Sequence, residues 1–201
     1  MTYCLGVLSS AGLVMAADSR SNAGVDQVQK VSKLALIVQP GSRVIGIYEQ
    51  RWSDPAPPLC VYLHGVGDPG NVGTVVRAAH AFGASSVALG PGCADPHGPK
   101  AVRASMGAIF TVALAHVSDI GELPGARIAL AADAEEPLQG SGEGELTLLV
   151  GSERDGLPPE ILAACDRVAR IPIATDSLNA AMAATVALYE MTRDSSRVPA
   201  S

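Results

Sequence analysis

The chain has 201 residues, of which 48% are hydrophobic and only 3% aromatic, and its formal net charge is -6. This length suits one domain, or one domain with a small appendage, and the apolar fraction is enough for a sizeable core. The negative charge excludes a protein that binds nucleic acid through its overall electrostatics, because neutralising phosphates needs clustered lysine and arginine, but a local basic cleft is compatible with it. The scarcity of aromatic residues argues against a stacking platform for single-stranded nucleic acid.

Cysteine usage and hydropathy set the expected compartment. The four cysteines lie far apart without a CxxC pair, so neither a zinc site nor a disulfide framework is suggested. A reduced, cytoplasmic setting fits this pattern. The N-terminus lacks a signal-peptide pattern, and no stretch approaches the roughly 20 apolar residues of a membrane span. We therefore expect a soluble cytoplasmic protein with no metal and no membrane partner.

The first 43 residues predict an antiparallel β-meander. Strands are expected at residues 2–8, 12–17 and 33–39, the first two around a tight turn and the third closed by Pro40-Gly41. Residues 44–52 are strand-like, and the proline-rich stretch 53–58 is predicted to be a stiff linker. The main domain is then expected at 59–193, followed by a frayed tail at 194–201.

From residue 59 onward, short apolar runs alternate with helical patterns. Strands are predicted at 59–63, 86–89, 109–115, 127–131, 146–150 and 167–171, and helices at 71–82, 100–106, 158–165 and 177–193. This alternation predicts an α/β domain with a mostly parallel sheet and helices on both faces. In such a sheet, ligands bind beyond the carboxyl ends of the strands, where the connecting loops gather.

Three polar loops follow predicted strands and open helices. The first, residues 65–73, precedes Arg77 and contains a G-x-G-x-x-G spacing, which alone is a weak sign of dinucleotide binding. The second is residues 151–157, and the third leads from Ile171 to Asn179. Polar residues of the last two loops are therefore expected to share one crevice.

Each polar residue of these loops also has an ordinary explanation. Arg77 can be a solvated charge, although its apolar neighbours favour burial, which would require a partner. Glu153 can orient Arg77, cap the helix that begins near Leu157, or be a loop carboxylate in water. Ser177 and Asn179 lie at a predicted helix start, where serine and asparagine are favoured as caps.

Together the three loops resemble the motifs of the SpoU (TrmH-like) RNA 2'-O-ribose methyltransferases. The matching stretches are Asp68-Pro69-Gly70-Asn71-Val72-Gly73 with Arg77, Gly151-Ser152-Glu153-Arg154-Asp155-Gly156-Leu157, and Ile171-Pro172-Ile173 with Ser177-Leu178-Asn179-Ala180-Ala181-Met182-Ala183 and Leu188-Tyr189-Glu190. Three motifs in this order are far more specific than any one of them. The resemblance covers about residues 44–193.

This resemblance implies a SPOUT fold, in which the C-terminal part of the parallel sheet is threaded into a trefoil knot that binds S-adenosylmethionine in a bent form. It also implies a homodimer that acts on tRNA or rRNA. By the same resemblance, the cofactor is held by Leu130, Ala131, Ala132, Gly151, Ile171 and Leu178. The residues that match the catalytic and substrate-contacting positions are Asn71, Arg77, Glu153, Ser177 and Asn179.

The role of Arg77 has two interpretations. Methyl transfer requires alignment of the ribose 2'-hydroxyl and removal of its proton. The candidate base of the family is an arginine, here Arg77, although a guanidinium is almost never deprotonated. Alternatively, Arg77 clamps an RNA phosphate while the proton passes to water or a neighbouring group. Arg77, Lys100, Arg103, Arg154 and Arg170 could form a local patch that faces RNA.

Residues 1–43 resemble the N-terminus of the Anbu-type proteasome-like peptidases, through Thr2-Tyr3-Cys4-Leu5-Gly6, Asp18-Ser19-Arg20 and Asn22-Ala23-Gly24-Val25-Asp26. The resemblance implies Thr2 as nucleophile, helped by Asp18 and Lys33. Because the remaining sequence does not supply the rest of such a peptidase, we expect a fused fragment without this chemistry. A threonine peptidase and a non-catalytic module that binds RNA or cofactor stay as alternatives to the methyltransferase.

Overall fold

The computed structural model describes residues 4–9, 12–17, 35–39, 43–47, 50–140, 144–175 and 177–193. The chain divides into two compact units, residues 1–51 and 52–201. Thr2, Asp18 and Lys33 lie outside the described residues, and so does the tail 194–201. The peptidase interpretation therefore stays a prediction.

The first unit contains a four-stranded antiparallel sheet in the order β1-β2-β4-β3. Its strands are β1 (Cys4–Ser9), β2 (Gly12–Ala17), β3 (Ala35–Gln39) and β4 (Arg43–Ile47). The predicted meander is wrong, because β4 inserts between β2 and β3. The long connection over residues 18–34 gives β3 enough chain to skip the position beside β2. The unit extends to Arg51, beyond the boundary expected at residue 43.

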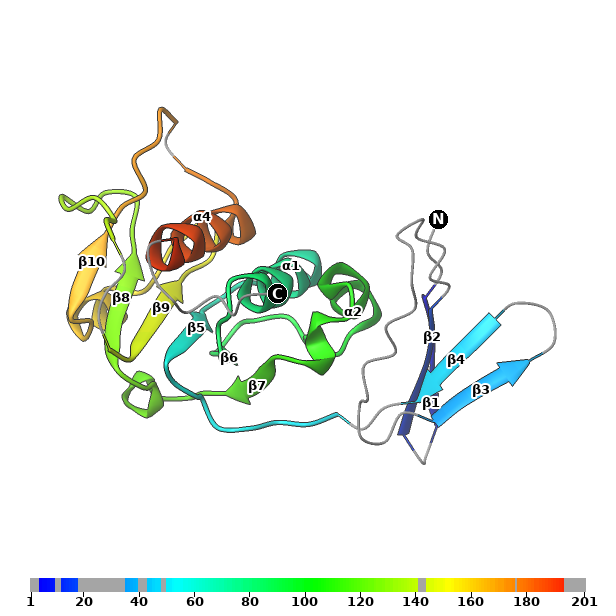
Figure 1. Ribbon diagram of the computed structural model, residues 1–201. Coiled ribbons are helices and arrows are strands. Elements are labelled where there is room, and N and C mark those ends of the chain that lie inside the picture. Colours follow the sequence, from blue (N-terminus) through cyan, green and yellow to red (C-terminus); the bar gives the residue numbers. More distant parts are fainter. Residues whose placement is uncertain are drawn as a thin grey trace. The chain divides into compact units, whose positions relative to one another are not determined.

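The second unit is built on a six-stranded sheet with the order β10-β8-β9-β5-β6-β7 (Figure 1). Its strands are β5 (Leu59–Leu63), β6 (Ser86–Leu89), β7 (Ala113–His116), β8 (Ala126–Leu130), β9 (Leu146–Val150) and β10 (Arg167–Ala169). All neighbouring pairs are parallel, which confirms the predicted α/β class. The central strands β5 and β9 are buried at every residue, as their largely apolar sequences predict.

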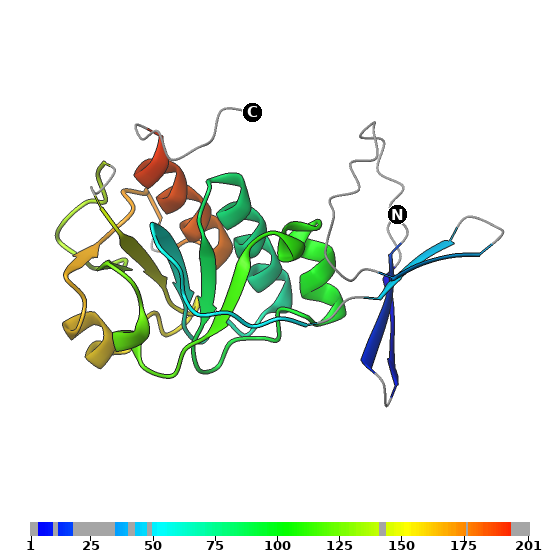
Figure 2. The ribbon, with the colours of Figure 1, turned by 60° about the horizontal axis from the view of Figure 1, so that its bottom comes forward.

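Helices cover both faces of this sheet, as predicted. The helices are α1 (Pro69–Ala81), α2 (Pro99–Ser105), α3 (Pro159–Ala163) and α4 (Ala180–Thr192), with 3-10 turns at Ala108–Phe110 and Ile120–Glu122. Figure 2 shows α1, α2 and α4 on one face and α3 on the other. Along β5, Val61 packs into the cluster of α1 and α4, whereas its neighbour Tyr62 packs with Ile161 of α3.

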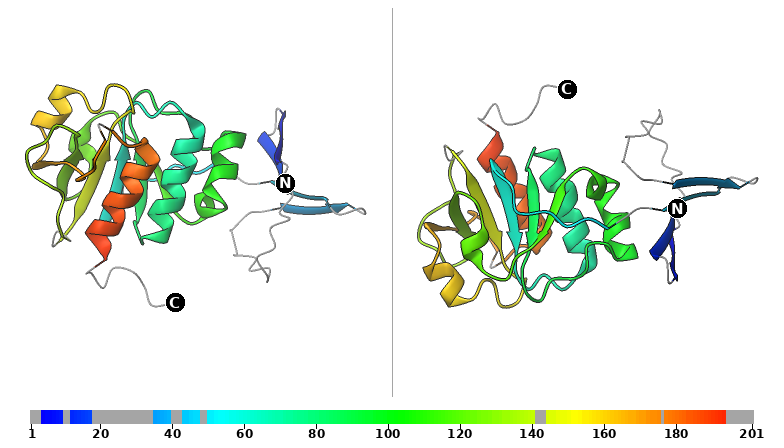
Figure 3. Two further views of the ribbon diagram at one scale, coloured as in Figure 1. Left: turned by 90° about the horizontal axis from the view of Figure 1, so that it is seen from above. Right: turned by 90° about the horizontal axis from the view of Figure 1, so that it is seen from below.

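Helices α4, α1 and α2 lie side by side, with α1 in the middle (Figure 3). Small residues of α4 such as Ala184 and Ala187 are fully buried and let the helix approach the sheet closely. The trefoil threading of the C-terminal part stays a prediction. Among the helices that the structure describes, none is long and apolar enough to cross a membrane.

Two predicted elements need correction. The strand expected at 109–115 begins only at Ala113, because Met106 and Gly107 adopt positive φ angles of 50° and 92° and turn the chain into a 3-10 helix first. The last helix begins at Ala180 and not at Ser177, because Asn179 is its N-cap. A short apolar run fits a helical turn as well as a strand, which explains the first error.

The stretch 52–58 starts at the outer strand β7 and passes Ser86 of β6, whose hydroxyl accepts from the amide of Ala56 at 2.8 Å. The amide of Ser53 donates a hydrogen bond of 2.7 Å to the carbonyl of Leu114, and the indole of Trp52 packs on His116 with ring centres 3.6 Å apart. Residue 52 was expected at the end of a strand, and its contact with His116 was not predicted. This stretch partly covers the exposed edge of the sheet, a position that natural proteins usually protect.

Candidate active site

The loop after β9 is a tight turn that glycine makes possible. A Cβ atom at Gly151 would lie on the carbonyl group of Gly156 and 2.5 Å from the amide nitrogen of Leu157. Gly156 has a φ of +66°, which side-chain-bearing residues rarely adopt. The amide of Asp155 donates to the hydroxyl of Ser152 at 3.1 Å and the amide of Gly156 to its carbonyl, also at 3.1 Å. The turn therefore presents residues 153–155 at its exposed tip.

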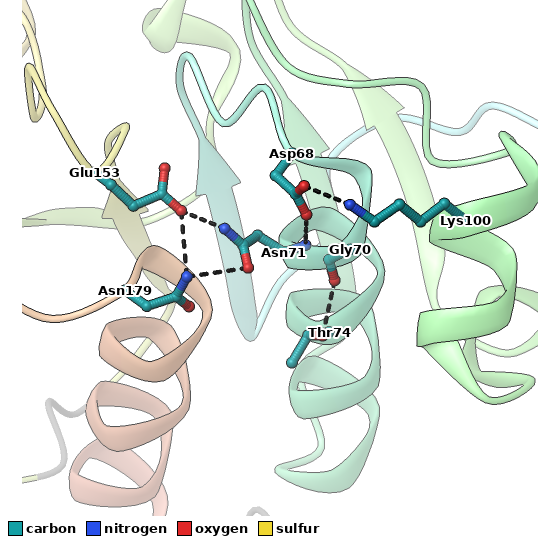
Figure 4. A network of polar contacts seen from close by, with 7 residues as sticks. All are labelled: Asp68, Gly70, Asn71, Thr74, Lys100, Glu153 and Asn179. Carbon is teal, nitrogen blue, oxygen red and sulfur yellow. Dashed lines mark hydrogen bonds and ion pairs between the residues drawn. The ribbon is translucent and has the colours of Figure 1, made fainter.

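Glu153 joins three parts of the chain at this tip (Figure 4). Its Oε1 atom accepts hydrogen bonds from the side-chain amides of Asn71 and Asn179, the second at 3.5 Å. The amide of Asn179 also donates to Oδ1 of Asn71 at 3.1 Å. Asn71 lies in the first turn of α1 and Asn179 caps α4, so this network links the starts of two neighbouring helices to the loop after β9.

The cap of each helix fixes one asparagine. Asp68 caps α1 by accepting from the backbone amide of Asn71 at 3.0 Å, and Pro69 follows at the first helical position, where proline is favoured. Lys100 approaches the other oxygen of Asp68 at 2.6 Å. This contact and the amide of Asn71 hold the pKa of Asp68 below its usual value. On α4, Oδ1 of Asn179 accepts from the amides of Ala181 and Met182.

A cavity of about 420 Å³ lies beside this network. Three chain segments line it: residues 130–133 after β8, residues 150–157 at the end of β9, and residues from 171 to 183 before and within α4. Leu162 of α3 completes the wall. Apolar side chains such as Leu157 and Ile171 line the cavity together with residues of the glycine turn. The cavity therefore combines an apolar interior with a polar mouth at Glu153.

The structure brings most of the predicted residues together. All six predicted cofactor residues, Leu130, Ala131, Ala132, Gly151, Ile171 and Leu178, line the cavity, and so do Glu153 and Ser177. Asn71 and Asn179 contact Glu153 but do not line the cavity. The catalytic and binding roles of these residues stay predictions.

For three residues the structure favours some of the alternatives that the sequence left open. Arg77 lies on the exposed side of α1, does not line the cavity, and makes no contact with Glu153 among the described residues. Glu153 therefore neither orients Arg77 in this structure nor caps α3, whose N-cap is Pro158. Ser177 is exposed and precedes the helix, and its carbonyl accepts from the Thr175 hydroxyl at 3.4 Å.

Sequence reasoning missed several residues at or near the site. Asp133 lines the cavity, and its only signal in the sequence was its position after a strand end. After β5, the Nδ1 atom of His64 lies 3.1 Å from the hydroxyl of Tyr62. Burial raises the pKa of Tyr62 to about 12, so this hydroxyl stays protonated. The described residues contain no group of three His, Cys, Asp or Glu that could hold a metal ion.

Comparison with known sequences identifies relatives over much of the second unit. A model of the SpoU rRNA Methylase family matches residues 58–189. An uncharacterized tRNA/rRNA methyltransferase of Mycobacterium bovis is 37% identical over 145 residues, covering 65% of this chain and 50% of the relative. The 23S rRNA (uridine(2479)-2'-O)-methyltransferase of Streptomyces viridochromogenes is 35% identical over 140 residues, covering 62% and 49%. The chain thus spans about half the length of these two relatives.

Solved structures agree with the sequence comparison. The SpoU methyltransferase AviRb from Streptomyces viridochromogenes, in complex with the cofactor AdoMet, superposes with a TM-score of 0.66 at 29% identity, covering 75% of this chain and 64% of that chain. An AdoMet-bound rRNA methyltransferase from Sinorhizobium meliloti has a TM-score of 0.67 at 32% identity, covering 78% and 66%. Since the family model matches more than half of its length, the chain belongs to the SpoU rRNA methylase family.

Proposed function

We propose that this protein transfers a methyl group from S-adenosylmethionine to a ribose 2'-hydroxyl of rRNA or tRNA. The observation that carries the proposal is the cavity beside the Asn71, Glu153 and Asn179 network, where all three family motifs meet. Names of the relatives support the reaction class and both kinds of RNA. One similar structure, with 32% identity and a TM-score of 0.60, comes from work on 2'-hydroxyl methylation of tRNA position 34.

The residues of the cavity fit an adenosine cofactor. Its volume falls in the range of roughly 300–1,000 Å³ that is typical of small-molecule sites. Leu130, Leu157, Ile171 and Leu178 offer apolar surface for the adenine ring. Gly151 supports the same wall, because even a single Cβ atom there would overlap the opposite strand of the turn. When bound, the cofactor supplies an activated methyl group to an aligned nucleophile.

The network at the mouth can orient the ribose. Glu153 presents a carboxylate that accepts hydrogen bonds, and the two asparagine amides hold it in place. A 2'-hydroxyl directed to Glu153 would be aligned for attack, and its developing positive charge would be stabilised by the nearby carboxylate. Ser177 lines the same cavity and would offer the substrate a hydroxyl.

For Arg77 we favour the phosphate clamp over the base. Its guanidinium is exposed on α1, whose first turn carries Asn71, and it makes no hydrogen bond or ion pair with another described residue. An exposed arginine has bidentate donors that suit a phosphate group. Replacing Arg77 with Ala should abolish methyl transfer and leave cofactor affinity within about twofold. Equal loss of both would make Arg77 a structural residue.

The decisive experiment combines cofactor binding with methyl transfer. Calorimetry should detect S-adenosylmethionine binding, and labelled cofactor should mark a defined 2'-O-methyl site when total RNA is incubated with the full chain. No binding at millimolar cofactor would refute the proposal. Binding without transfer to any RNA would instead support the non-catalytic module.

We also propose that the protein is a homodimer through one face of α4. Met182, Val186 and Tyr189 are large apolar residues that are 61%, 42% and 53% exposed. Their spacing places them on one side of the helix, and Tyr189 meets Phe82 at the end of α1 edge to face. A continuous exposed apolar stripe of this kind is typical of an interface, and a two-fold axis would pair it with itself.

Light scattering on a sizing column tests the dimer. Val186→Glu should convert a dimer into a monomer, because it places two carboxylates at a self-complementary contact. The matched control is Ala163→Glu, which adds the same charge at an exposed residue of α3. A monomeric wild-type chain, or dissociation by both variants alike, would contradict this assignment.

A further inference from the structure

Among the charged residues that line the cavity, acidic residues outnumber basic ones. Asp133, Glu153 and Asp155 are acidic, and Arg154 is the one cation among the described lining residues. A ligand carboxylate would be repelled by these three acidic residues and attracted only by Arg154 among the described charged residues of the lining. Arg154 is the residue there whose charge complements such a group.

Arg154 is also available to a ligand. It lies at the exposed tip of the turn held by Gly151 and Ser152, and its side chain makes no hydrogen bond or ion pair with another described residue. Two other arginines, Arg167 of β10 and Arg170 directly after it, are bound to other residues instead. Arg170 donates to the carbonyl of Ala134 at 2.9 Å, and Arg167 donates to Glu136 at 2.8 Å.

We propose that Arg154 binds the carboxylate of the amino-acid part of the cofactor, an inference that rests on the proposed function. In S-adenosylmethionine, three carbon atoms separate the sulfur from the carboxylate carbon. The cation that holds this carboxylate must therefore lie close to the reacting end of the site. Arg154 follows Glu153 directly, and adjacent Cα atoms are about 3.8 Å apart. A guanidinium binds a carboxylate through two parallel hydrogen bonds, which would fix the tail and orient the methyl group.

Two adenosine compounds separate this role from general effects on the cavity. S-adenosylhomocysteine carries the amino-acid part, whereas 5'-methylthioadenosine keeps the adenosine and thioether but lacks it. With Arg154→Ala, calorimetry should show roughly ten- to hundredfold weaker binding of S-adenosylhomocysteine, the usual cost of losing a charge-assisted hydrogen bond. Binding of 5'-methylthioadenosine should stay within twofold. Arg154→Lys should fall between, because lysine offers a point charge without the planar fork.

The controls assign each outcome. Arg103→Ala removes an equally exposed arginine from α2, outside the cavity, and should leave both affinities unchanged. Unchanged S-adenosylhomocysteine binding in Arg154→Ala, or equal weakening of both compounds, would overturn the inference. If that variant lost RNA on filter binding but kept S-adenosylhomocysteine, Arg154 would be an RNA contact instead. A wild-type chain that binds neither compound would refute the proposed function itself.

Discussion

Asn179 has two separable tasks, and substitutions can measure each one. Its Oδ1 atom caps α4 through the amides of Ala181 and Met182 at 3.0 and 3.3 Å, while its Nδ2 atom binds Asn71 and Glu153. Asn179→Ala removes both and should lower the free energy of unfolding by about 0.5–2 kcal/mol, the usual effect of a lost N-cap. For a domain of this size, each kcal/mol shifts the melting temperature by roughly 2–4 °C.

Asn179→Ser distinguishes the two tasks. Serine caps helices about as well as asparagine, so thermal unfolding should stay close to that of the wild type. It lacks an amide to reach Glu153, so methyl transfer should fall as strongly as in Asn179→Ala. If the serine variant lost as much stability as the alanine variant, the cap would not be the stabilising contact. If it kept full activity, the Asn71 and Glu153 network would have no part in catalysis.

Asn179→Asp adds an electrostatic check. Aspartate keeps the cap, but it replaces an amide nitrogen 3.5 Å from Glu153 with a negatively charged oxygen. Two unit charges at about 4 Å repel by about 1 kcal/mol in water, and this exposed pair lies near that limit. The aspartate variant should therefore be about 1 kcal/mol less stable than the serine variant. Adding Glu153→Gln should abolish this difference, and an unchanged gap would refute the repulsion.

Two further predictions concern the turn after β9 and the buried side chain of His97. Gly151→Ala forces the turn apart at Gly156 and Leu157, so calorimetry should show at least about tenfold weaker binding of adenosine compounds. Gly107→Ala is the control, because Gly107 has open space around it but a φ of 92°. This control should lower stability and leave binding unchanged. Burial lowers the pKa of His97 below 6.5 despite Asp95 nearby, so the unfolded chain binds the proton first and the free energy of unfolding should fall as pH drops below about 6.5. Urea titrations at several pH values should show this slope in the wild type and not in His97→Asn, and the fluorescence of Trp52, whose ring lies 5.0 Å from His97, should follow the same transition.

Local sequence patterns predicted the second unit well because burial dictates them. Strands β5 and β9 are largely apolar because both faces of a central parallel strand are covered, and Thr147 is the one polar residue of β9. The start of α4 was placed too early, because Ser177 and Asn179 are both good caps and only tertiary packing selects between them. The order of the first sheet was missed for a related reason: the pairing of Val14 with Ile47 joins residues far apart in the sequence.

The site was predicted in membership but not in geometry. The family motifs named eight of the residues that line the cavity, but also Arg77, which lies outside it. No local signal shows that Glu153 binds Asn71, 82 positions away. One of the alternatives from the sequence paired Glu153 with Arg77, the arginine of the first motif. The structure instead pairs the carboxylate with two neutral amides. An amide fixed by a helix start is already positioned, whereas a flexible arginine would lose side-chain entropy on pairing.

The two helix starts explain why a carboxylate lies at this point. Asn71 is in the first turn of α1 and Asn179 caps α4, so Glu153 contacts the N-terminal ends of both helices. Each helix carries a partial positive charge at that end, which favours an anion. This arrangement holds the carboxylate of Glu153 in place beside the cavity, although the chain already has a net charge of -6. Arg77 stays exposed on α1. In the proposed reaction, the ribose hydroxyl would then meet a carboxylate that the starts of both helices hold in place.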